Sequence, residues 1–567
     1  MKQNQVGMRL LFLLNLLLIP ANMVAILTGF LAFAVPSGTI FDIFLDFVFQ
    51  IAFYGNIIVH VVIFLGMARS KIKIAQRLWF LMKSYMLFFL GATLFYSIYA
   101  ATVAFEIIIP EPFRIITALI TQVFHIGQYT TGIVLNWYSL RSISKNRLRN
   151  AIWISNSPRT RWADRSMFSK LWHSVSILFV VICMVSLIYI TIVFTTGLPI
   201  GVAMAAGEIA GNFFLLGIFI CVFLIRAYRI SSSKKGRAAT TILFASALVL
   251  SVVTVLPWAG TFNTIASLDD QFSTTFGSSW NNGLRSPGGN ELRASPIYFK
   301  DNLIAELPPE VEVIKNIAYT TGINRTLMFD WYAPVGTKDS SSLLPLVISI
   351  HGGGWNVGDK GELIPVLKKI ANIGFVVVDI QYSLFHEGGT FSEMIREIGN
   401  LTVFLETHGE YNADLSRTFF TGRSAGGHLS LVCGLGCDNS TFSGNFSSQL
   451  DVKGIIAYYP PTNFSLSENI RDEYLSLSTM SHQEVDIHAP IHMVNPTSPP
   501  VLIYQGEVDK LVIKEHAYNF KSKMDEYNNT MLLGLFPYAG HAFDALVNTY
   551  YAQACQYYTE RFLSILA

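Results

Sequence analysis

The sequence predicts an N-terminal all-α transmembrane bundle in residues 1–262, joined to an α/β domain with a mostly parallel sheet in residues 301–567. Only 14% of the chain is charged and 51% is hydrophobic, whereas soluble domains usually carry about 25% charged residues. Long apolar runs stop near residue 262, and shorter strand-like and amphipathic segments follow. Residues 263–300 are rich in Gly, Ser, Asn and Pro, which predicts a linker or irregular lead-in.

Seven apolar stretches are long enough to cross a bilayer, because a transmembrane helix needs about 20 mainly apolar residues. The first stretch is longer than a typical signal peptide and lacks a clear small-residue cleavage site, so we interpret it as a span. Polar side chains at helical spacing inside several stretches fit either interhelical hydrogen bonds or a polar cavity. The predicted spans are residues 9–35, 41–68, 79–105, 115–140, 175–198, 202–225 and 238–260.

Lysine and arginine concentrate in alternate loops, and this sets the predicted orientation. The loops after the second, fourth and sixth stretches hold nearly all the loop cations, whereas the opposite loops offer only Arg114. Positive residues favour the cytoplasm, so the N-terminus and the basic loops are expected there and the C-terminal domain is extracellular or lumenal. Sequons for N-glycosylation occur only in the C-terminal half, at Asn324, Asn400, Asn439, Asn445, Asn463 and Asn528.

Short apolar segments predict the strands of the C-terminal domain. The first two are expected to form a hairpin, and the later ones to be parallel strands covered on both faces. The predicted strands are residues 311–319, 327–333, 345–350, 375–380, 417–422, 454–459, 500–505 and 530–537. Amphipathic segments between them predict helices at residues 391–408, 425–435, 514–527 and 547–565.

A G-x-S-x-G motif from Gly422 to Gly426 lies between an apolar strand and a helical segment, which is the context of a nucleophile elbow. Ser424 is the predicted nucleophile. A serine hydroxyl needs a base, and in this arrangement the acid and the base follow the serine in that order along the chain. Asp509 follows a strand and His541 follows the last strand, so they are the predicted acid and base; Glu507 is the weaker alternative for the acid.

Three consecutive glycines follow the strand that ends at residue 350, in the motif His351-Gly-Gly-Gly-Trp355. Backbone N–H groups without side chains can approach a negatively charged oxygen closely. Gly352 and Gly353, together with the N–H of Ala425, are therefore predicted to form an oxyanion hole. A phosphate-binding loop is the alternative, but no Gly-Lys-[Ser/Thr] follows the glycines.

These motifs resemble the α/β-hydrolase superfamily, and within it the carboxylesterase/lipase group that includes the hormone-sensitive-lipase-like enzymes. The resemblance covers about residues 300–567 and implies hydrolysis of acyl esters without a metal or cofactor. Two segments depart from the family. Residues 379–384 differ from its usual D-Y-R-L, so a supporting polar contact is expected to be missing, and Arg423 places a cation beside the nucleophile. The residues that carry the resemblance are 351–355, 422–428, Gly506 with Asp509, and Gly540 with His541.

The expected function is that of a membrane-anchored serine esterase or lipase acting on a lipid or other small amphipathic ester. One alternative is a transporter or receptor whose hydrolase-fold domain only binds a ligand. Another is similarity to the isoprenylcysteine methylesterases, which also join spans to this fold but whose substrates face the cytoplasm. The net charge of +2 gives no case for a nucleic-acid partner. The substrate and the oligomeric state are left open.

Two other groups of residues admit alternatives. The resemblance places a cap at residues 463–495, where a solvated loop is favoured over a metal site because Pro490 interrupts any helical histidine pair. The candidate ligands there are His482, Asp486, His488 and His492. The cysteines of the C-terminal half either include one disulfide or are small buried residues; they are Cys433, Cys437 and Cys555.

Overall fold

The computed structural model describes most of the C-terminal half of the chain, namely residues 233–299, 301, 309–437, 443–466 and 480–567. Before residue 233 it describes residues 184–198 and isolated positions from 133 onwards. The predicted spans 9–35, 41–68 and 79–105 lie outside the described residues, as do nearly all of 115–140 and most of 202–225. The seven-helix bundle therefore stays a prediction.

Eight strands form a single sheet in the order β1-β2-β4-β3-β5-β6-β7-β8. β1 and β2 form an antiparallel hairpin and β2 is antiparallel to β4, whereas every other pair is parallel. The predicted mostly parallel sheet is confirmed, with each strand close to its expected position. The strands are Glu312–Thr321, Thr326–Ala333, Leu344–Ile350, Val376–Ile380, Ala413–Arg423, Val452–Tyr458, Val501–Gly506 and Met531–Phe536.

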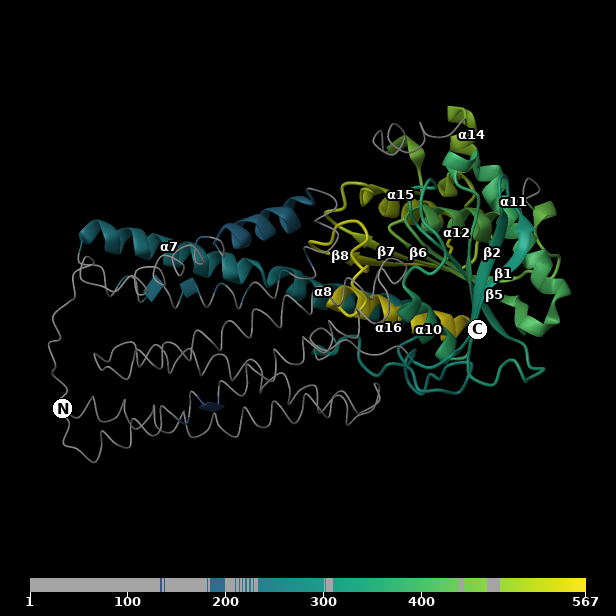
Figure 1. The fold of residues 1–567 in the computed structure, drawn as a ribbon, viewed down its shortest axis with the longest axis horizontal. Helices are drawn as coiled ribbons and strands as arrows, with labels where there is room; N and C mark the ends of the chain where they lie inside the picture. Colours follow the sequence, from purple (N-terminus) through teal and green to yellow (C-terminus); the bar gives the residue numbers. More distant parts are fainter. Residues whose placement is uncertain are drawn as a thin grey trace.

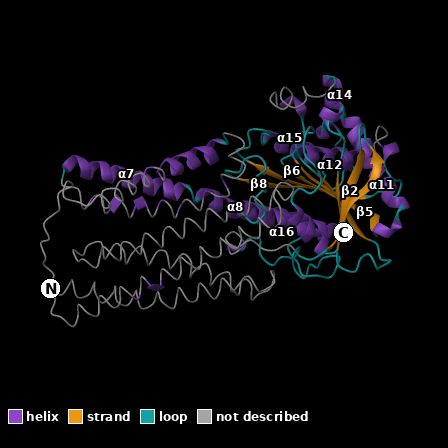
Figure 2. Cartoon of the chain, in the orientation of Figure 1, coloured by secondary structure: helices purple, strands orange, loops and turns teal. Residues whose placement is uncertain are grey.

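Helices cover both faces of the sheet, as Figure 2 shows. Successive strand residues point to opposite faces, so Ile348 packs into one core and Val347 into the other. The first core includes residues of α11, α12 and α15, and the second includes residues of α10, α16 and the helix α8, Leu256–Phe276. The sequence predicted α11, α12, α15 and α16 as helices of this domain, but not α10. The helices are α10 Ile364–Asn372, α11 Phe391–Thr407, α12 Ala425–Gly436, α15 Glu515–Glu526 and α16 Tyr550–Leu566.

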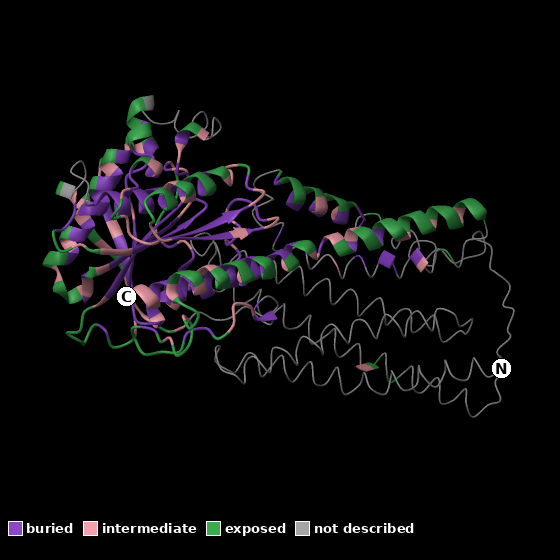
Figure 3. Ribbon diagram, turned by 180° about the vertical axis from the view of Figure 1, so that it is seen from behind, coloured by how far each residue is buried: buried purple, intermediate pink, exposed green. Residues whose placement is uncertain are grey.

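A long apolar helical segment leads into the C-terminal domain. It consists of α7, Lys234–Val253, and α8, Leu256–Phe276. Together they span 43 residues with a mean hydropathy of 2.3 in the most apolar window, which makes this segment the one helix among the described residues long and apolar enough to cross a membrane. Most residues of α7 are exposed (Figure 3).

The predicted linker at residues 263–300 is only partly irregular. Its beginning is helical, because α8 continues to Phe276 and buries Leu268 and Phe272 against the sheet at helical spacing. Turns and irregular backbone begin at Gly277. The boundary predicted at residue 262 therefore falls inside α8.

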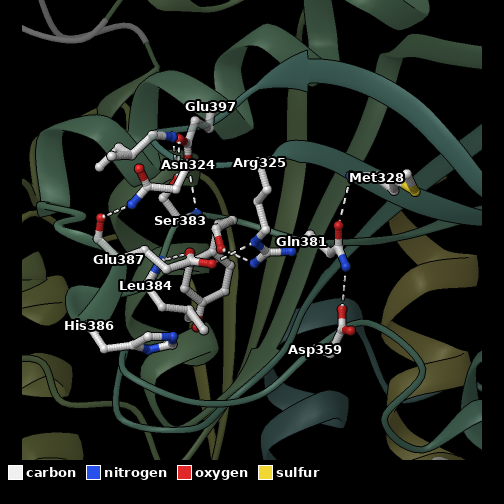
Figure 4. A network of polar contacts seen from close by, with 12 residues as sticks. Asn324, Arg325, Met328, Asp359, Gln381, Ser383, Leu384, His386, Glu387 and Glu397 are labelled. Atoms are coloured by element: carbon white, nitrogen blue, oxygen red, sulfur yellow. Dashed lines mark hydrogen bonds and ion pairs between the residues drawn. The ribbon is translucent and has the colours of Figure 1, made fainter.

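The loop after β4 holds polar contacts that its departure from the family motif did not predict (Figure 4). The Gln381 side chain accepts a hydrogen bond from the Met328 backbone N–H at 2.9 Å and donates to the Asp359 carboxylate at 2.7 Å. Arg325, directly before β2, pairs with Glu387 of the same loop at 2.7 Å between Nε and Oε1. The loop after β4 therefore does have supporting polar contacts, and residues in and next to β2 provide two of them.

Candidate active site

The G-x-S-x-G motif forms a sharp turn between β5 and α12. Ser424, the residue at the turn, has φ 53° and ψ −118°, a conformation that side-chain-bearing residues seldom adopt. The glycines permit the tight packing around it. A Cβ added to Gly426 would lie 2.0 Å from the carbonyl oxygen of Ile350, and one added to Gly422 would lie 2.3 Å from the carbonyl oxygen of Gly426. This geometry is that of a nucleophile elbow.

The structure brings the three predicted catalytic side chains together. His541 Nε2 lies 2.9 Å from Ser424 Oγ, and His541 Nδ1 lies 2.8 Å from Asp509 Oδ2. Asp509 and His541 are only 2% and 4% exposed. The carboxylate that contacts the imidazole is therefore that of Asp509 and not the alternative, Glu507, whose backbone N–H donates to a carbonyl oxygen of β8.

Backbone N–H groups hold the Asp509 carboxylate in place. Its Oδ1 accepts hydrogen bonds from the N–H groups of Leu511 at 2.8 Å and Val512 at 2.9 Å. Its Oδ2 faces the imidazole. The carboxylate is thus oriented by its own loop, and the remaining oxygen fixes the orientation of the His541 ring.

The three-glycine loop packs directly against the elbow. A Cβ on Gly352 would lie 3.7 Å from Ser424 Cβ, and Gly353 has φ +108°, which favours glycine. The Gly352 N–H already donates to Glu362 Oε2 at 3.3 Å, a contact that the sequence did not predict. Ala425 begins α12, and the first N–H groups of a helix lack carbonyl partners within it. Of the three predicted donors, Gly352 is thus one whose N–H already has an acceptor.

The side chain of His351 packs beside the three-glycine loop. Its ring stacks on Tyr382 with 4.3 Å between the ring centroids, and its Nδ1 lies 2.8 Å from the Gly352 carbonyl oxygen. Burial lowers the pKa of His351, so the ring is neutral at pH 7. His351 therefore acts as a packed support for the glycines.

The cation beside the nucleophile does not face outward. The Arg423 side chain pairs with Asp544, three residues after His541, and its guanidinium lies 4.1 Å from the centroid of the Tyr458 ring. Tyr459 donates a hydrogen bond to the same carboxylate at 2.6 Å. Sequence reasoning missed Asp544 because its partner is 121 residues away along the chain.

A second buried histidine joins the elbow helix to the cap segment. His428 Nδ1 accepts a hydrogen bond from Trp355 Nε1 at 3.2 Å, and Nε2 lies 2.9 Å from the carbonyl oxygen of His488. Burial lowers the pKa of His428 to about 3. Phe391 and Phe464 pack around the same ring. The ring of His488 joins the same cluster, with 5.6 Å between its centroid and that of Phe391.

The structure also describes some of the candidate metal ligands in residues 463–495 and the three cysteines of the C-terminal half. In the described parts of the chain, no cluster of three or more His, Cys, Asp or Glu side chains is arranged to hold a metal ion. Cys433, Cys437 and Cys555 are buried thiols and not disulfide partners of one another. This agrees with the interpretation of the cysteines as small buried residues.

The C-terminal half of the chain is similar to known esterases. The family described as BD-FAE matches residues 329–524. A probable carboxylic ester hydrolase, LipM of Mycobacterium tuberculosis, is 25% identical over 222 residues, which is 37% of this chain and 51% of LipM. A probable isoprenylcysteine alpha-carbonyl methylesterase of Oryza sativa is 28% identical over 164 residues, which is 29% of this chain and 38% of that protein.

Two solved structures of esterases are similar to part of the chain. Esterase B of Lactobacillus rhamnosis is 22% identical, with 42% of this chain and 81% of that chain covered and a TM-score of 0.38. A truncated carbohydrate esterase from gut microbiota is 20% identical, with 45% and 99% covered and a TM-score of 0.37. The chain spans about half the length of the mycobacterial esterases it matches. Its C-terminal domain is similar to the α/β-hydrolase carboxylesterases.

Proposed function

We propose that the C-terminal domain hydrolyses carboxylic esters through Ser424, His541 and Asp509. The observation that carries this proposal is the 2.9 Å contact of His541 Nε2 with Ser424 Oγ, with Asp509 on the opposite ring nitrogen. A base in hydrogen-bond contact with a serine, oriented by a third group, is what activation of a hydroxyl requires. The similarity to carboxylic ester hydrolases agrees with this chemistry.

The reaction follows from these contacts. Ser424 Oγ attacks the ester carbonyl carbon while its proton passes to His541 Nε2, and Asp509 stabilises the resulting imidazolium. The tetrahedral intermediate collapses as the bond to the alcohol oxygen breaks, and His541 gives the proton to the leaving alcohol. Water, deprotonated by His541, then attacks the acyl–Ser424 ester. The products are a carboxylic acid and the free serine.

The negative oxygen of the intermediate needs donors beside the elbow. The N–H groups of Gly353 and Ala425 are assigned this role, because Ala425 begins α12 and Gly353 directly follows Gly352, which packs against Ser424. Gly352 contributes only if its N–H exchanges the Glu362 carboxylate for the oxyanion. Loss of one such donor typically costs about 3–4 kcal/mol of barrier.

The N-terminal half anchors this domain in a membrane, on the side away from the cytoplasm. The apolar α7 and the basic residues before and within its first turns support this orientation. Asn528 is an exposed sequon of the domain. The ester is a lipid or another amphipathic ester, because a membrane-anchored site meets such molecules at high local concentration.

Hydrolysis of a soluble short-chain ester by the full-length protein in detergent tests the enzyme. We expect turnover by the wild type and a loss of about 10⁶-fold in Ser424→Ala. Ser416→Ala is the matched control, because Ser416 is an exposed serine at the other end of the same strand. Equal activity of the two variants would remove Ser424 as the nucleophile, and absence of turnover by the wild type would favour a ligand-binding ectodomain.

A methylesterase acting on isoprenylcysteine is the second candidate, favoured by the similarity to the rice protein. Such a substrate faces the cytoplasm, so the two candidates differ in the side on which the domain lies. In a eukaryotic cell, a glycan lost in Asn528→Gln supports the non-cytoplasmic ester hydrolase. Absence of any glycan, with turnover of a prenylcysteine methyl ester, supports the second candidate.

A further inference from the structure

Helix α8 runs along the edge strand β8 in the opposite direction. Near its start, Gly260 packs on Pro537, just past the end of β8, with 3.0 Å between an added Cβ and the proline Cβ. Further along, the Gln271 side chain accepts from the Leu533 N–H at 2.8 Å and donates to the Leu533 carbonyl oxygen at 3.0 Å. The start of α8 therefore lies at the carboxyl end of β8.

The carboxyl end of β8 belongs to the edge of the sheet that carries the candidate catalytic residues. β5, β7 and β8 are parallel, and Ser424, Asp509 and His541 follow their respective carboxyl ends. Figure 1 shows α7 continuing away from the domain beyond the start of α8. The apolar helix thus departs from the catalytic edge and not from the opposite edge.

The length of α7 places one membrane boundary close to this edge. The last basic residue at its start is Arg237, and Leu256 lies 19 positions further along the chain. At 1.5 Å per residue they span about 28 Å, close to the roughly 30 Å of a hydrocarbon core. Exposed apolar side chains, such as Ile242 and Val252, lie along this length. The second boundary therefore falls about one turn before the contact of Gly260 with Pro537.

A second apolar helix, Met184–Thr196, also ends on the catalytic loops. Gly197 packs so closely on the carbonyl oxygen of Val508 that an added Cβ would lie 2.0 Å away, and Val508 directly precedes Asp509. Phe194 packs edge-on against Tyr538, three residues before His541, with 5.7 Å between ring centroids. Two apolar helices far apart in the sequence thus meet the same edge of the domain.

From these contacts we infer that the catalytic edge lies at the membrane surface and that the ester cleaved at Ser424 belongs to a lipid resident in the bilayer. The ester bonds of a lipid lie at the boundary between head groups and acyl chains, so a lipid reaches this edge without leaving the membrane. The inference rests on the proposed function. It adds the source of the substrate and the direction from which it enters.

The depth of the catalytic edge is measured with a dye on Lys510→Cys in full-length protein reconstituted in phosphatidylcholine vesicles. Lys510 is exposed and adjoins Asp509, whereas Glu526, exposed at the end of α15, leads into the amino end of β8. Glu526→Cys is therefore the matched control, and labelling of the wild type is subtracted. With a nitroxide on the lipid head group, we expect at least threefold stronger quenching at position 510. Equal quenching would overturn the inference.

The substrate is tested in the same vesicles with dioleoylglycerol as the probe. At a fixed bulk amount, tenfold dilution with a non-hydrolysable ether lipid is expected to lower the rate several-fold, while hydrolysis of a soluble short-chain ester is unchanged. A rate unaffected by dilution would contradict the inference, as would turnover of the soluble ester alone. Loss of both activities would instead contradict the proposed function.

Discussion

Arg423 and Asp544 form a buried ion pair, with 2.6 Å between Nε and Oδ2. Arg423 directly precedes the nucleophile, and Asp544 follows His541 by three residues, so the pair ties the elbow to the histidine loop. Tyr459 strengthens the link, because its hydroxyl donates to Asp544 and its ring centroid lies 4.6 Å from that of His541. We interpret Arg423 and Asp544 as positioning residues that keep the base against the serine.

Asp544→Asn is predicted to lower kcat at least tenfold while KM changes less than about twofold. The variant removes the charge that holds Arg423, and a shift of about 1 Å between reacting groups can cost 10²-fold in rate. Steady-state kinetics on a soluble ester measure the effect. Removal of one partner from a buried pair also costs about 3–5 kcal/mol of stability, so the assay is run well below the melting temperature.

The control is Asp414→Asn, which breaks the more exposed pair of Asp414 with Arg417 on the same strand as Arg423. We expect kcat to stay within twofold of the wild type. If Asp544→Asn kept full kcat and lost only thermal stability, the pair would be structural and would have no positioning role.

Gly426→Ala is predicted to reduce ester hydrolysis by more than 10²-fold. The added Cβ would lie 2.0 Å from the carbonyl oxygen of Ile350, so the elbow must move away from β3. Gly409→Ala is the matched control, since a Cβ there meets nothing within 4 Å. Rates of hydrolysis and circular dichroism separate a displaced elbow from an unfolded domain. Full activity of Gly426→Ala would contradict the described packing.

The buried His428 is predicted to make stability fall as the pH falls. Its pKa is about 3 in the folded chain, whereas an ordinary histidine titrates near 6.5. Between these values the unfolded chain binds a proton that the folded chain lacks, so the free energy of unfolding decreases toward low pH. One such group contributes up to about 1.4 kcal/mol per pH unit.

Urea unfolding of His428→Asn, between pH 6.5 and 4, isolates this contribution. The slope of the unfolding free energy against pH is expected to decrease by up to about 1.4 kcal/mol per pH unit relative to the wild type. His492→Asn replaces an exposed histidine and should leave the slope unchanged. An unchanged slope in His428→Asn would show that this ring is not buried in its neutral form.

Gln271→Leu is predicted to destabilise the domain by about 1–3 kcal/mol. The glutamine side chain satisfies both backbone groups of Leu533 on the edge strand, and buried groups left unpaired cost about that much. Asp270→Asn is the control, because Asp270 is exposed on the neighbouring position of α8. Thermal unfolding compares the two variants, and equal melting temperatures would contradict the docking of α8 on β8.

The sequence predicted the parts of the domain that depend on local patterns. Runs of apolar residues marked the strands, and the elbow motif fixed where β5 ends and α12 begins. The proposed acid and base could be picked out because Asp509 and His541 each follow a strand in the expected order. The partner of Arg423 could not be predicted, because Asp544 comes close to it only in the folded domain. The sequence also does not tell whether a charged residue beside a nucleophile is paired or exposed.

Two other features of the structure were not predicted from the sequence: a contact of the three-glycine loop and the extent of α8. The Glu362 carboxylate accepts from the Gly352 N–H, ten positions earlier in the chain, and no local pattern marks that contact. The linker prediction ended the apolar region too early, because α8 mixes polar and apolar residues. One side of it bears Leu268 and Phe272 in the core, and polar residues such as Gln271 cap the edge strand. Composition alone cannot separate such a helix from a linker.

The most direct test of the account is the site at which a fluorophosphonate attaches to the full-length protein. Mass spectrometry of the labelled chain should find one phosphonyl group per molecule, on the peptide that contains Ser424. Labelling should be slowed at least 10²-fold in His541→Asn. A wild-type protein that stays unlabelled, or that carries the adduct on another residue, would contradict the assignment of Ser424 as an activated nucleophile.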